Sequence, residues 1–202
     1  MRVSPEEWRR LDLRIHALTE GVPLHDVWCV DLPGGPPGVT LSDMQRLLTE
    51  GRLVRGPAVR FLFSLRRTLG RIFGWDRERS PSDSGGGPGF FRDRLTDEDR
   101  RASLLPAGSP DGLFRALYLR PRESASEVAN RTVHAVSSFA LVERPGGHRL
   151  YWAIYVRPVG RLTRWYMALI DPFRRWLIYP ALLRAVRTAW DRDFGARGAG
   201  AK

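Results

Sequence analysis

The stretch from residue 130 to 190 constrains the fold of this chain more than any other. It contains two apolar, strand-like runs separated by Pro145-Gly146-Gly147, followed by a long run rich in aromatic residues. Two apolar runs around a Pro-Gly turn are typical of a β-hairpin, and the helical spacing of the apolar residues beyond it predicts a long amphipathic helix. Antiparallel strands with helices before and after them predict an α+β fold.

The rest of the chain shows further elements by apolar periodicity and by Gly and Pro punctuation. Ser4 and Pro5 mark the start of the first helix, which Gly21 ends, and Thr40 or Ser42 caps the next. We expect helices over 4–21, 41–48, 57–75 and 162–190, and strands over 25–32, 102–106, 113–120, 126–143 and 148–157. The final helix is expected to bend at Asp171-Pro172 and to kink at Pro180.

The length of 202 residues and the hydrophobic content of 43% fit one globular domain over residues 1–202. Residues 1–24 form an N-terminal helical extension, and residues 25–190 form the body. The low-complexity segment 78–89 is expected to be a surface loop, because its Ser, Gly and Pro residues favour no regular structure.

The net charge of +11 suggests an acidic partner at first sight. However, Lys202 is the only lysine, and arginine in place of lysine is what the codon usage of a GC-rich genome produces. The arginines are also scattered through the chain. We therefore do not expect a nucleic-acid partner. The arginines of the 57–75 helix leave two interpretations open: an amphipathic helix that covers a sheet, or one that lies on an anionic membrane surface.

Several classes of site find no support in the sequence. Cys29 is the only cysteine, and the four histidines have no metal-ligand spacing, so we expect no disulfide and no metal site. No GxGxxG motif is present, and no cofactor is expected. The charged N-terminus does not resemble a signal peptide, and no apolar run approaches the ~18 residues of a membrane span, so we expect a cytoplasmic protein.

Asn130, Thr132 and His134 alternate along one predicted strand, so their side chains should share a face. If that face lines an apolar cavity, the three could orient a ligand, with His134 and Asn130 as catalytic candidates and His134 as the general acid or base. Two alternatives remain: His134 is a structural histidine, or the row faces solvent. The odd-numbered residues from 133 to 141 form the neighbouring row. This row is more apolar, so it is the alternative candidate for the face that lines a cavity.

Aromatic residues and one arginine complete the candidate ligand-binding set. Besides Thr132 they are Tyr118, Trp152, Tyr155, Trp165, Tyr166 and Arg174. The alternative is that the aromatic residues are ordinary core and the arginine is solvated.

Residues 130–135 (NRTVHA), the FALV that follows, and GRLTRWYMALIDPFRRWLIYPALLR from residue 160 resemble the bacterial DUF2867 family, a domain of unknown function. The resemblance runs from about residue 25 to residue 190. This family is similar to the START-like (SRPBCC) helix-grip superfamily, in which a curved antiparallel sheet wraps around a long C-terminal helix and an apolar cavity. The family pattern has histidine after a Pro-Phe pair, where this chain has Arg174. Some relatives are fused to a nucleotide-binding domain, whose motif this chain lacks.

The resemblance implies that the protein binds a hydrophobic or amphipathic small molecule in an internal cavity. It would act as a carrier or as a cofactor-free, cyclase-like enzyme, since such folds host both. The alternative is a non-catalytic peripheral membrane protein that uses the 57–75 helix. The sequence indicates no oligomeric state.

Overall fold

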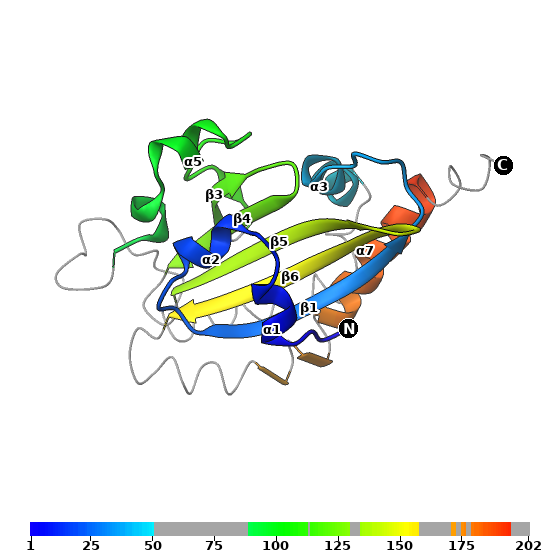
Figure 1. Ribbon diagram of the computed structural model, residues 1–202, viewed down its shortest axis with the longest axis horizontal. Helices are drawn as coiled ribbons and strands as arrows, with labels where there is room; N and C mark the ends of the chain where they lie inside the picture. Colours follow the sequence, from blue (N-terminus) through cyan, green and yellow to red (C-terminus); the bar gives the residue numbers. More distant parts are fainter. Residues whose placement is uncertain are drawn as a thin grey trace.

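The computed structural model describes residues 1–50 (side chains to residue 46), 89–112, 114–129, 134–157, 171–172, 175–176 and 179–194. Over these residues the fold is α+β, with a curved antiparallel sheet in the strand order β1-β6-β5-β4-β3-β2 (Figure 1). The strands are β1 (Leu24–Pro33), β2 (Pro110–Asp111), β3 (Phe114–Leu119), β4 (Glu123–Ala129), β5 (His134–Arg144) and β6 (Gly147–Arg157). The helices are α1 (Pro5–Arg9), α2 (Arg14–Leu18), α3 (Leu41–Glu50), η3 (Phe91–Arg94), α5 (Asp97–Arg101) and α7 (Tyr179–Asp193).

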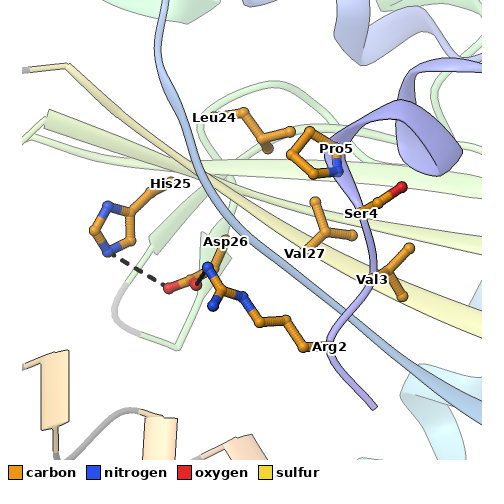
Figure 2. Close-up of a pocket in the computed structure, with 8 residues that line it drawn as sticks. All are labelled: Arg2, Val3, Ser4, Pro5, Leu24, His25, Asp26 and Val27. Atoms are coloured by element: carbon orange, nitrogen blue, oxygen red, sulfur yellow. Dashed lines mark ion pairs between the residues drawn. The ribbon is translucent and has the colours of Figure 1, made fainter.

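The first strand of the sheet pairs with the last one, and the strands from β2 to β6 follow one another as a meander. β1 is therefore an edge strand, and the N-terminal residues cover part of it. Figure 2 shows the N-terminal segment beside β1. Val3 N donates to Val27 O at 2.9 Å, and Cys29 N donates to Met1 O at 2.7 Å. These bonds satisfy backbone groups that an open edge would leave available to other chains.

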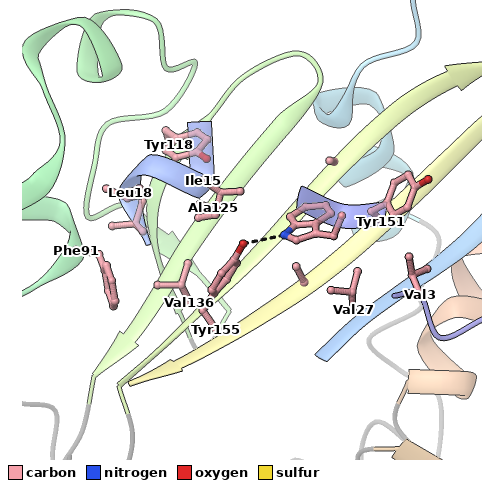
Figure 3. Packing of buried hydrophobic residues seen from close by; sticks show 14 of the residues in the cluster. Val3, Ile15, Leu18, Val27, Phe91, Tyr118, Ala125, Val136, Tyr151 and Tyr155 are labelled. Carbon is pink, nitrogen blue, oxygen red and sulfur yellow. Dashed lines mark hydrogen bonds between the residues drawn. The ribbon is translucent and has the colours of Figure 1, made fainter. Parts of the chain in front are cut away.

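The two faces of the sheet carry separate parts of the core, and the helices divide between them (Figure 1). We call them the α2 face and the α7 face. Val27, Val136 and Tyr155 belong to the α2 face, where they pack with residues of α1, α2 and η3 (Figure 3). On the α7 face, Leu141 packs with Trp190 and other residues of α3 and α7. The alternation over residues 25–32 predicts that Val27 and Cys29 face one side of β1 and that Trp28, Val30 and Leu32 face the other, and this is confirmed.

Some predicted elements are confirmed and others are wrong. The turn between the last two strands, with Arg144 opposite Gly147, is confirmed. The strand predicted over residues 126–143 is wrong, because β4 and β5 are two antiparallel strands and no Gly or Pro marks the break between them. Residues 102–106 form no strand. The predicted first helix is two short helices, since Leu13 is extended at φ −129 and ψ 138.

The C-terminal helix is only partly covered by the described residues, so its predicted length stays a prediction. The described part of α7 begins at Tyr179, with Pro180 as its second residue, so the predicted kink at Pro180 also stays a prediction. The predicted helix over 57–75 and the predicted loop over 78–89, apart from Gly89, lie outside the described residues. None of the described helices is both long enough and apolar enough to cross a membrane.

We expect Gly35→Ala to lower the free energy of unfolding by about 2–3 kcal/mol. Gly35 has φ +86, and a Cβ there would collide with the ring of Trp190, which is fully buried. Gly38→Ala is the matched control, because Gly38 has φ +80 but no atom within 4 Å of a Cβ. It should cost only the backbone strain of about 1 kcal/mol. Urea unfolding of both variants measures the difference, and equal losses would show that the contact with Trp190 is unimportant.

Candidate functional site

His134, the predicted proton-transfer residue, lies at the start of β5 on the α2 face, opposite α7. Its ring is 1% exposed, and its Nε2 is 3.1 Å from Glu127 Oε2. The same carboxylate accepts hydrogen bonds from the backbone N–H groups of Phe91 (2.9 Å) and Arg92 (3.4 Å). The ring of Phe91 also packs edge-on against the imidazole, with centroids 4.7 Å apart. His134 and Glu127 thus form a buried pair that holds η3 against the sheet.

The structure thus places His134 on the face of the sheet opposite α7, and its role as a general acid or base stays a prediction. A general acid or base must reach its substrate, and His134 is covered by η3 on the other face of the sheet. The predicted polar line cannot be followed further, because Asn130 and Thr132 lie outside the described residues. Trp165, Tyr166 and Arg174 also lie outside them.

Tyr118 and Tyr155, predicted to line the ligand pocket, also belong to the α2 face. Tyr155 Oη accepts a hydrogen bond of 2.8 Å from Trp8 Nε1 (Figure 3). Tyr118 donates its hydroxyl proton to Glu123. Burial raises the pKa of Tyr155, and burial together with the Glu123 carboxylate raises the pKa of Tyr118 well above its usual value. Both hydroxyls therefore stay protonated and act as hydrogen-bonding groups of the core.

Among the described residues that were predicted to bind a ligand, Trp152 lies on the α7 face. The register of β1, β5 and β6 aligns it with Trp28 and Phe139. Trp152 stacks on Phe139 with centroids 5.4 Å apart, and Tyr179 of α7 lies 5.0 Å from Trp28 and 4.8 Å from Trp152. We call Trp28, Phe139, Trp152 and Tyr179 the aromatic cluster.

Two indole N–H groups of the aromatic cluster differ in their hydrogen bonding. Trp152 Nε1 donates to Ser137 Oγ at 2.8 Å. Trp28 Nε1 is buried and has no hydrogen-bond partner among the described residues. Most buried tryptophan N–H groups are bonded, so an unused donor beside three aromatic rings can serve a ligand.

A second group of polar residues lies where β1 pairs irregularly with β6. His25 Nε2 is 2.9 Å from Asp171 Oδ1 and 3.4 Å from Asp26 Oδ2. We call His25, Asp26 and Asp171 the bulge cluster. It adjoins a pocket of about 340 Å³ between the N-terminal segment and β1 (Figure 2). Sequence reasoning missed this cluster, because no spacing rule joins His25 to an aspartate 146 residues away.

The comparisons with known proteins identify a family but not an activity. The family model described as "Protein of unknown function (DUF2867)" matches residues 18–181, which is most of the chain. The chain belongs to the DUF2867 family. This confirms the resemblance seen in residues 130–135 and 160–184. No curated protein and no solved structure matches this DUF2867 chain. Both clusters described above are built from residues inside the matched range.

Proposed function

We propose that this DUF2867 protein is a helix-grip protein that binds a hydrophobic or amphipathic small molecule on the α7 face. Two features of the fold support the architecture. The sheet is curved with its first and last strands adjacent, and α7 packs across one face. A sheet that wraps around a C-terminal helix in this way suits an internal site, because helix and sheet together can enclose an apolar ligand.

The unpaired indole N–H of Trp28 is the observation that carries the proposal. A ligand with an apolar body would pack on the aromatic cluster, and an acceptor atom on it would bond to Trp28 Nε1. Trp28, Phe139 and Trp152 are each only partly buried, although they sit on adjacent strands that face α7. Aromatic side chains with few placed polar groups are typical of small-molecule sites. We propose a carrier, since His134 lies on the opposite face and cannot act on such a ligand.

We expect Trp28→Phe to weaken binding of 1-anilinonaphthalene-8-sulfonate by about fivefold, the value of one hydrogen bond of ~1 kcal/mol. Trp152→Ala should weaken it more, because it removes stacking surface. Trp176→Phe is the matched control, since Trp176 is 82% exposed and lies outside the cluster. The measurement is a fluorescence titration at constant protein concentration, with circular dichroism melts to confirm that each variant is folded.

Native mass spectrometry of the freshly purified protein provides a second test that needs no probe. A defined apolar compound bound at near-stoichiometric occupancy, and depleted in Trp152→Ala, would support the carrier. The proposal fails if the dye binds all four proteins equally and no compound accompanies the native protein.

The membrane-surface alternative rests on one described feature, the exposure of Trp176 beside Arg175. Tryptophan next to a cation suits the interface of a membrane. Sedimentation with vesicles of anionic phospholipid tests it. Binding that Trp176→Phe weakens and high salt abolishes would favour the peripheral membrane protein, because salt screens exposed charges.

A further inference from the structure

The pairing of β1 with β6 contains an irregularity that positions two polar side chains. Leu24 is opposite Tyr155 and Asp26 is opposite Ile154, so His25 is an extra residue on β1. Such a β-bulge re-aims side chains at the edge of a sheet. Asp26 thereby points toward the α7 face, where Ile154 packs with Tyr179. The C-terminal segment brings Asp171 to the same place, 2.9 Å from His25.

The carboxylate of Asp26 is the anomaly of this region. Its side chain is fully buried, and neither oxygen accepts a hydrogen bond from any described residue. The two guanidinium groups nearest to it, Arg2 and Arg175, remain 3.9 and 3.7 Å from Oδ1. Burying an ionised carboxylate without hydrogen bonds is costly, by several kcal/mol in real proteins. A cation in direct contact with the Asp26 carboxylate would offset this cost.

We propose that His25, Asp26 and Asp171 bind a divalent transition-metal ion. One imidazole nitrogen and two carboxylates lie with their candidate ligand atoms within 4.8 Å of one another. Bonds of about 2.0–2.2 Å to zinc place neighbouring ligand atoms roughly 2.8–3.6 Å apart. The distances of 2.9 and 3.4 Å from His25 Nε2 to the two carboxylates fall within that interval.

The donor set indicates which ions fit. Imidazole suits zinc, cobalt and iron, whereas magnesium and calcium take oxygen ligands. Three protein ligands would leave at least one position for water or another molecule. Because Asp26 and Trp28 are two residues apart on one face of β1, the metal site would adjoin the aromatic cluster. The metal proposal does not depend on ligand binding there.

The competing explanation is an ion-pair cluster in which Arg2 and Arg175 alone balance Asp26. Their side chains are 60% and 37% exposed, so both can turn into solvent when a metal ion binds. Arg2 and Arg175 lie near Oδ1 of Asp26, whereas His25 lies near Oδ2. In the ion-pair explanation, no metal binds, and His25 contributes only a hydrogen bond to Asp171.

The experiment is a calorimetric titration of chelator-treated, full-length protein with zinc chloride, and with magnesium chloride as the comparison ion. We expect one zinc ion per chain and no magnesium binding at the same concentrations. His25→Ala and Asp171→Asn should each weaken zinc binding at least tenfold. Asp31→Asn is the matched control, because Asp31 is a β1 carboxylate that pairs with Arg149 away from the cluster. It should bind zinc as the wild type does.

Cobalt provides an independent readout. Visible absorption bands of protein-bound cobalt(II) should appear in the wild type and in Asp31→Asn, and should be lost in His25→Ala. Asp171→Asn keeps the volume of the side chain, so circular dichroism should show a folded variant. The proposal is overturned if the wild type binds no zinc, or if His25→Ala and Asp171→Asn bind zinc with unchanged affinity and spectrum.

Discussion

Glu123→Ala is expected to lower the free energy of unfolding by about 3–5 kcal/mol, because each buried donor left without an acceptor costs about 1–3 kcal/mol. Glu123 begins β4 and is 6% exposed. Its carboxylate accepts hydrogen bonds from Arg14 N at 2.9 Å and Ile15 N at 2.8 Å, and from the hydroxyl of Tyr118. Alanine would leave these three donors without an acceptor.

The large effect follows from what Glu123 does for α2. The residue before this helix, Leu13, provides no side-chain cap. The carboxylate of Glu123, on β4, acts as the cap instead. Its negative charge lies at the positive end of the helix. Glu123→Gln keeps one acceptor oxygen but adds a donor that has no role, so a smaller loss of about 2 kcal/mol is expected.

Urea unfolding monitored by tryptophan fluorescence measures these losses. Glu143→Ala is the control. The Glu143 side chain is 48% exposed, and its Oε2 lies 3.8 Å from Nη2 of the exposed Arg122. It should change stability by less than about 1 kcal/mol, as exposed ion pairs do. A loss below about 1 kcal/mol for Glu123→Ala would contradict the capping role.

The sequence predicted those parts of the fold that local patterns specify. Alternation in β1 correctly separated its two faces, and Thr40 was correctly named as a cap: Asp43 N donates to Thr40 Oγ1 at 3.2 Å. The turn at Pro145-Gly146 was specified by residues that favour it. In contrast, nothing local distinguishes one long strand over residues 126–143 from two strands, because the alternating pattern continues on both sides of the break.

The candidate site was harder to predict, because it depends on contacts between distant residues. Polar residues at alternate positions left open whether His134 faces a cavity or is a structural histidine, and only the structure shows its buried contact with Glu127 on the α2 face. The bulge that aims Asp26 toward the α7 face has no signature in the sequence. Its partner Asp171 was noted only as a residue at a helix bend, and only the tertiary structure brings the two together.

Asp99→Asn is expected to lower the free energy of unfolding by about 2–4 kcal/mol at neutral pH and to change how stability depends on pH. Asp99 is 2% exposed and links α5 to α2 and to Arg120, which directly follows β3. Its carboxylate accepts two hydrogen bonds of 2.8 Å from Arg14 and one of 2.8 Å from Arg120. Thr96 adds its N–H and hydroxyl, both at 2.9 Å. The variant keeps the shape of the side chain but loses the charge.

The direction of the pH effect follows from the same contacts. The hydrogen bond from Arg14, above all, lowers the pKa of Asp99 far below its usual value near 4. A carboxyl whose pKa is lower in the folded state stabilises the protein above the unfolded pKa, and this contribution is lost as the pH falls toward the folded pKa. Urea midpoints measured between pH 6 and pH 2 should therefore fall less steeply below pH 4 in Asp99→Asn than in the wild type. Glu98→Gln, on the exposed side of α5, is the control for an ordinary charge loss in this helix, and a wild-type acid slope in Asp99→Asn would refute the prediction.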